Sequence, residues 1–259
     1  MLGHSVGSVR RSQFSVAALF LLLGFNVGTW TSRLPDLKLQ LGIAADDVGI
    51  LLLACGLGAA CAFPLTTTRL EKWGAKYLAL AAGLILPVLL IALSLTTHFH
   101  FAVLIMFLEG VVCAQMNSAM NSQGVAVEIV GKQKILSKLH ATFSLGMLLA
   151  ALFSSQVMQE TELINIHFII SGVIILLFLV FAYFGLLSQE LKIATKPSGL
   201  LLPAAGTIWL GIIIFFGSIV EGSMYDWSTI YLFEVAGATK KFAPEAVRGK
   251  FGCCCARTA

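Results

Sequence analysis

The sequence predicts an all-α membrane protein with seven transmembrane helices. Of its 259 residues, 58% are hydrophobic and 12% are charged, and the mean hydropathy is +0.91. A soluble domain carries about a quarter charged residues. The chain also contains apolar stretches of about 20 residues, the length that a helix needs to cross the hydrocarbon core. Strand-like alternation is absent from these stretches, so helices rather than a barrel are expected to satisfy the backbone hydrogen bonds.

Seven stretches have this length and composition. The second is typical, because Gly56, Gly58, Ala59 and Ala60 give it a surface of small residues that lets neighbouring helices pack closely. In chain order, the predicted spans are residues 13–30, 48–65, 77–96, 101–120, 139–157, 167–187 and 201–220.

The basic residues predict the orientation of the chain. They are concentrated on alternate connections between the spans, and such connections are cytoplasmic under the positive-inside rule. A cytoplasmic N-terminus leaves Arg33 and Lys38 outside before the seventh span and places ten basic residues inside, namely Arg10, Arg11, Arg69, Lys72, Lys76, Lys132, Lys134, Lys138, Lys192 and Lys196. We therefore expect a multi-pass protein of the plasma (inner) membrane whose first span is an uncleaved anchor. Its basic loops suit anionic lipid headgroups, so no nucleic-acid partner is expected.

Polar side chains gather in the first, fourth and seventh spans, and this spacing by threes suggests a three-helix unit used repeatedly. A charge at mid-bilayer costs about 3 kcal/mol or more, so Glu109 is expected to face the bundle interior or water. Helical periodicity places Cys113, Asn117 and Asn121 near the same face. The candidate residues of a solute cavity are Asn26, Trp30, Glu109, Gln115, Asn117, Asn121, Glu221, Asp226 and Trp227.

Two interpretations of these residues stay open. In the first, they line a cavity that binds a hydrophilic solute, and Glu109 and His140 are candidates for a proton-linked role. In the second, they form interhelical hydrogen bonds that hold the bundle together, and His140 is an ordinary interfacial side chain. No metal site is expected, because His98 and His100 in the turn before the fourth span lack further ligands.

Several stretches of the sequence are distinctive. They are residues 30–36 (Trp-Thr-Ser-Arg-Leu-Pro-Asp), 71–76 (Glu-Lys-Trp-Gly-Ala-Lys), 116–124 (Met-Asn-Ser-Ala-Met-Asn-Ser-Gln-Gly), 139–146 (Leu-His-Ala-Thr-Phe-Ser-Leu-Gly) and 221–228 (Glu-Gly-Ser-Met-Tyr-Asp-Trp-Ser). Together they resemble the major facilitator superfamily, in the branch that includes fucose permease. The resemblance covers the chain from about residue 20 to residue 244. It implies the six-helix N-terminal half of a two-half bundle plus a seventh helix, with solute bound by the first, fourth and seventh helices.

The loop after the second span is a degraded form of the superfamily's Asp-Arg-x-Gly-Arg-Arg signature. The resemblance implies that Glu71, Lys72, Gly74 and Lys76 act there as a cytoplasmic latch between two states. Asn117 stands where relatives often have a carboxylate, which leaves Glu109, two turns away, as the candidate for proton coupling.

The superfamily has about twelve spans in two halves, whereas seven are predicted here. We divide the chain into a six-helix half (residues 1–190), a cytoplasmic linker (191–200), the seventh helix with its outer end (201–244) and an atypical tail (245–259). The composition changes abruptly after Pro244, so we expect a frameshift or premature stop near that residue. The expected partners are the bilayer, a small solute with or without protons, and a missing C-terminal half or a second copy of the chain.

The predicted function is secondary active transport of a small hydrophilic solute, a sugar or another polar metabolite, by alternating access, in a truncated and impaired copy. The alternative is a non-transporting membrane scaffold, or a half-carrier subunit that needs a partner. An enzyme is not expected, because no catalytic Ser/His pairing, His-x-x-x-His or Cys-x-x-Cys is present in the spans. No phosphate-binding Gly-rich loop is present, and no cofactor is expected.

Overall fold

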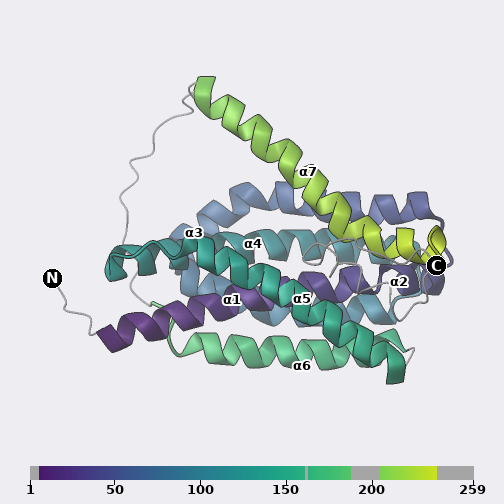
Figure 1. Cartoon of the computed structure of the whole chain (residues 1–259), viewed down its shortest axis with the longest axis horizontal. Coiled ribbons are helices and arrows are strands. Elements are labelled where there is room, and N and C mark those ends of the chain that lie inside the picture. Colours follow the sequence, from purple (N-terminus) through teal and green to yellow (C-terminus); the bar gives the residue numbers. More distant parts are fainter. Residues whose placement is uncertain (1–5, 161–162, 188–204, 238–259) are drawn as a thin grey trace, which may run out of the picture.

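The computed structural model describes residues 6–160, 163–187 and 205–237 and shows a bundle of helices (Figure 1). Helices make up nearly all of this part of the chain, which confirms the predicted all-α fold. In chain order they are α1 (Val6–Ser32), α2 (Leu34–Leu41), α3 (Ala45–Leu95), α4 (Phe99–Gly131), α5 (Leu136–Glu160), α6 (Ile164–Tyr183) and α7 (Ala205–Glu234). The predicted linker at 191–200 and the tail at 245–259 lie outside the described residues.

Helix α3 contains the predicted second and third spans as two segments that meet at Gly74. A straight helix of its 51 residues would be about 75 Å long, more than twice the hydrocarbon thickness. Instead, Gly74 leaves the helical conformation (φ 80°, ψ 158°), a backbone region that favours glycine. Gln40 lies just before the start of α3, and its side-chain amide donates hydrogen bonds to the carbonyls of Ser94 and Thr96 at the end of α3. The two ends of α3 therefore lie together, and the helix folds back on itself at Gly74.

The short helix α2 was not predicted from the sequence. It begins with Pro35 in its first turn, where the missing N–H of proline costs nothing. It ends at Gly42 in the left-handed conformation (φ 63°), which turns the chain into α3. Its residues Leu34, Pro35 and Leu37 are buried, so α2 packs onto the bundle rather than forming an extended outer loop.

The bundle has two ends, which we name the Gly74 end and the α2 end. At the Gly74 end, the start of α1 meets the ends of α4 and α6, since Gly131 lies against Val9 and Gly185 against Arg11. At the α2 end, α2 meets both ends of α3 and the start of α6. Successive helices thus run between the same two ends, as a protein that crosses a membrane repeatedly requires.

Six described helices are long and apolar enough to span a membrane, and α3 has the length for two crossings. Large apolar side chains also cover the outside of the bundle, for example Phe63 (71% exposed) and Val88 (63%) on α3. Such a surface is stable only in contact with lipid or with another protein. These helices make the chain a multi-pass membrane protein.

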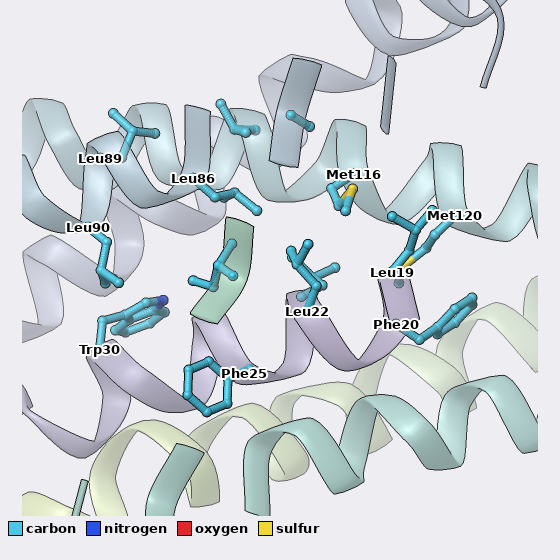
Figure 2. Packing of buried hydrophobic residues seen from close by; sticks show 14 of the residues in the cluster. Leu19, Phe20, Leu22, Phe25, Trp30, Leu86, Leu89, Leu90, Met116 and Met120 are labelled. Carbon is cyan, nitrogen blue, oxygen red and sulfur yellow. The ribbon is translucent and has the colours of Figure 1, made fainter. Parts of the chain in front are cut away.

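The core is built around α1, whose side chains are buried along most of its length (Figure 2). Leu19 and Leu22 pack near Met116 and Met120 of α4, and Trp30 lies beside Leu90 of α3. Helix α1 makes its most extensive contacts with α5, α6 and α4. It is therefore the central helix of the described bundle, and polar residues on it lie deep inside.

Two helix pairs pack in the same way, through reciprocal glycine contacts. In the α1–α5 pair, Gly24 faces the carbonyl of Phe143 and Gly146 faces the carbonyl of Leu21. In the α3–α4 pair, Gly110 faces the carbonyl of Cys55 and Gly58 faces the carbonyl of Phe107. In both pairs, each glycine lies against the carbonyl of the residue three positions before the glycine of the other helix. If the three-helix unit suggested by the sequence is used to align the helices, α1 corresponds to α4 and α5 corresponds to the first segment of α3. The two glycine pairs then occupy corresponding positions.

Several predicted boundaries need correction. Helix α4 continues to Gly131, so Asn121 lies on the helix rather than beyond it. Helix α7 begins at Ala205 and ends at Glu234, which places Asp226 and Trp227 inside the helix instead of near its end. The predicted spans stopped where polar residues began, whereas the helices continue past those residues. Polar residues do not end a helix when their side chains face neighbouring helices.

Candidate functional site

The structure brings Asn26 and Glu109 together in the centre of the bundle. The Asn26 side-chain amide donates a hydrogen bond of 2.5 Å to Glu109 Oε1, which joins α1 to α4. Both residues are buried, with 0% and 3% of their surface exposed. Cys113 Sγ lies 3.5 Å from the same oxygen, one turn along α4. The pair therefore links two helices that correspond to each other in the three-helix unit suggested by the sequence.

Each member of this pair keeps one polar atom without a hydrogen-bond partner. These atoms are Asn26 Oδ1 and Glu109 Oε2, and both are buried acceptors when the carboxyl group is ionised. A buried acceptor without a donor costs about 1–3 kcal/mol, and more when it is charged. A proton on the carboxyl group, a water molecule or a solute hydroxyl would remove that cost. The site is thus built to receive a donor.

The remainder of the predicted polar stripe on α4 is divided between two environments. Asn117 is exposed and Asn121 half-buried, and the two bond to each other, from Asn121 Nδ2 to Asn117 Oδ1 at 2.5 Å. Gln115 is buried, and its Nε2 has no partner. Gln123, which was not predicted as a site residue, is buried and clamps the backbone of Leu187 with two hydrogen bonds of 3.0 and 3.1 Å. The stripe therefore continues from the buried pair to an exposed face.

The predicted residues of α7 make no hydrogen bond to Asn26 or Glu109 in the part of the chain that the structure describes, but Asp226 and Glu109 both lie close enough to Cys55 of α3 to interact with it electrostatically. Glu221 accepts a bond of 3.1 Å from Tyr225 on its own helix. Asp226 is half-buried, and the Trp227 ring lies next to Gly49 of α3, where an added methyl group would come within 3.9 Å of the ring. Residues 206–220 of α7 are exposed throughout, so α7 meets the bundle only through its last turns.

Two other predicted residues have surroundings of a different kind. Trp30 is buried in the core beside Leu90, although its ring nitrogen has no hydrogen-bond partner (Figure 2). His140 is exposed near the Gly74 end, with its ring edge-on to Phe20 at 5.1 Å. Nearby Glu128, which was not predicted as a site residue, accepts bonds from the backbone of Ile135 and Leu136 and so caps the start of α5.

The loop signature occupies the turn at the Gly74 end. Gly74 supplies the positive φ of the turn, as expected for a tight reversal. The Lys76 ammonium lies over the ring of Tyr183 on α6, 4.8 Å from its centroid. The Arg69 guanidinium lies over the Trp73 ring at 5.7 Å. The Lys76 contact ties the turn to α6, and both cation–π contacts hold basic side chains at this end.

Sequence reasoning missed a buried cluster around Arg33, which it placed in an exposed outer loop. Arg33 is only 1% exposed and joins three helices, bonding to His167 Nδ1 of α6 at 3.1 Å and to Asp36 of α2 at 2.9 Å. Arg33 Nη2 and His167 Nε2 have no partner. The cause of the error is α2, whose packing covers the end of α1. The signal in the sequence was Pro35-Asp36, which begins two residues after the arginine.

A pocket of about 500 Å³ opens beside this cluster at the α2 end. Its apolar lining includes leucines of α2 and α3, and its polar lining comes from Arg33, Asp36, Gln40, Ser94, Thr97 and Asn165. None of the predicted cavity residues lines it. It is therefore separate from the Asn26–Glu109 pair.

The chain is similar to curated bacterial membrane proteins. It is 34% identical to an uncharacterized transporter of Sinorhizobium fredii over 233 residues, which are 88% of this chain and 61% of that protein. It is 28% identical to an uncharacterized MFS-type transporter of Yersinia pestis (87% of this chain, 58% of that protein) and 22% identical to the membrane protein MosC of Rhizobium meliloti (87% and 55%). No family model matches the chain. The chain thus spans a little over half the length of these relatives.

Proposed function

We propose that this chain is a secondary active transporter of the major facilitator type, in the fucose permease branch, which moves a small hydrophilic solute by alternating access. The carrying observation is the buried Asn26–Glu109 pair between helices α1 and α4. A carboxyl group inside a transmembrane bundle is costly and usually serves a solute or proton path. The names of the two more similar relatives, both transporters, support the same assignment.

The position of α7 fits alternating access. Its contacts with the bundle lie at the α2 end, where Thr229 bonds to the Thr31 carbonyl at 3.3 Å. Towards the Gly74 end, α7 diverges from the other helices (Figure 1). A carrier whose solute path is open at one end and closed at the other has this asymmetry. In the proposed orientation, the open end is cytoplasmic.

The function is tested with the purified chain in liposomes and a panel of radiolabelled sugars and other polar metabolites. We expect at least one solute to bind or enter, and we expect Glu109→Gln to weaken its binding about tenfold or more, a loss of about 1.4 kcal/mol. The amide oxygen of this variant still accepts the bond from Asn26, so the fold is kept. Glu160→Gln, at an exposed carboxylate at the end of α5, is the matched control. Unchanged binding in Glu109→Gln would leave the pair with a packing role only.

The proposed orientation gives a second prediction. In a cysteine-free background, Gln133→Cys lies between α4 and α5 at the Gly74 end, and Asn165→Cys lies on α6 at the α2 end. With the N-terminus in the cytoplasm, a thiol reagent that does not cross membranes should label Asn165→Cys in intact cells. It should reach Gln133→Cys only after the membrane is opened. The reverse pattern would invert the orientation.

A further inference from the structure

Helix α2 is fixed to the bundle on one side by deeply buried contacts. Arg33 holds it to the start of α6 through Asp36 and His167. Gln40 holds its other end to the carbonyls of Ser94 and Thr96 at 3.0 and 2.7 Å. Leu34, Pro35 and Leu37 fill the space beneath it. Helix α2 therefore moves with α1, α3 and α6 as one body.

On its other side, α2 carries the described ion pair that reaches α7. Lys38 Nζ contacts Glu234 Oε1 in the last turn of that helix. The Lys38 and Glu234 side chains are 17% and 34% exposed, whereas the Arg33 side chain is 1% exposed. Exposed ion pairs are weak, and breaking a buried one strands a charge away from water. Among the charged contacts of α2, the ion pair with α7 is thus the one that can separate at low cost.

We infer that α2 closes the bundle at the α2 end. Arg33 positions α2 on α1 and α6, and the ion pair between Lys38 and Glu234 holds the end of α7 against α2. Separation of Lys38 from Glu234 frees α7 from α2, and α7 is then joined to the bundle by the Thr229 hydrogen bond to Thr31 and by the buried Ile230 side chain. Arg33 acts here as a positioning residue, since it touches Asp36 and His167 rather than α7. This closure goes beyond the proposed function, because it is a conformational change that can be measured without any solute.

The test uses the full chain in liposomes, with the native cysteines replaced and spin labels at Leu95→Cys and Val235→Cys. Both positions are exposed at the α2 end, one at the end of α3 and one just after α7. Lys38→Glu should shift the label–label distance distribution to longer values. The charge-swapped double variant Lys38→Glu/Glu234→Lys should return it to the original distribution.

Glu160→Lys serves as the matched control, because it reverses one exposed charge at the same end of the bundle. Its distance distribution should stay that of the unmodified chain. Should Lys38→Glu fail to fold, Lys38→Gln gives the same test without a new repulsion. An unchanged distribution in the Lys38 variant, or a double variant that stays open, would overturn the inference. The distance measurement does not depend on the solute screen, so the inference about α2 and the proposed function are tested independently.

Discussion

Gly110→Ala is expected to destabilise the folded bundle by about 3 kcal/mol or more, because a methyl group there collides with the backbone of α3. The atom it would meet is the Cys55 carbonyl oxygen, with the Ala59 nitrogen 3.0 Å away. Backbone atoms cannot turn aside as a flexible side chain does, so the two helices must separate. The measurement is the melting temperature of the purified protein, together with the fraction that stays monodisperse in detergent.

The matched control for this prediction is Gly56→Ala. Gly56 lies on α3, two residues from the Gly58 that packs against α4, and a methyl group there meets nothing within 4 Å. Its melting temperature should stay close to that of the unmodified chain, or rise slightly because alanine favours the helix. Equal melting temperatures for Gly110→Ala and Gly56→Ala would contradict the close α3–α4 crossing.

Asn26→Leu is expected to destabilise the fold by about 1–3 kcal/mol, because Glu109 then stays buried without the amide that donates to it. The cost should largely disappear in Asn26→Leu/Glu109→Met, which removes both partners of the bond. A double-mutant cycle of melting curves measures this coupling. Asn121→Leu, which removes only an amide pair on a partly exposed face, should cost less than about 0.5 kcal/mol.

The same cycle separates the two roles of the pair. If the residues only hold α1 to α4, the apolar double variant should fold and bind solute as the original chain does. If they lie on the solute path, it should fold but lose binding. If the destabilisations caused by the two single substitutions simply add in the double variant, Asn26 and Glu109 do not interact. That result would contradict the hydrogen bond between them.

Much of the fold could be predicted because long apolar stretches in a bilayer have one stable form. The spans, the helical class and the reversal at Gly74 all follow from hydrophobic length and from the backbone freedom of glycine. Helix α2 could not be predicted, because eight residues with Pro35 near the start look like a loop. Its stability comes from the surface beneath it. The burial of Arg33 depended on α2 and was missed for the same reason.

The candidate site was predictable in part. The burial of Glu109 follows from the cost of a charge in hydrocarbon, and its spacing to Cys113 follows from the helical period. Its partner on α1 could not be read from the sequence, because the rotation of α1 relative to α4 is set by packing at distant glycines. The clamp of Gln123 on Leu187 was missed because a backbone partner leaves no signature in the sequence.

The central claim is that the polar face of α4 borders a water-filled solute path rather than lipid. The most direct measurement is the reaction of a charged, membrane-impermeant thiol reagent with Asn117→Cys and Leu108→Cys, each in a cysteine-free chain in liposomes. Both side chains are exposed on the same helix, Leu108 by 40%, so exposure alone does not distinguish them. We expect rapid labelling of Asn117→Cys and none of Leu108→Cys. Equal labelling of the two, or protection of Asn117→Cys, would contradict the claim.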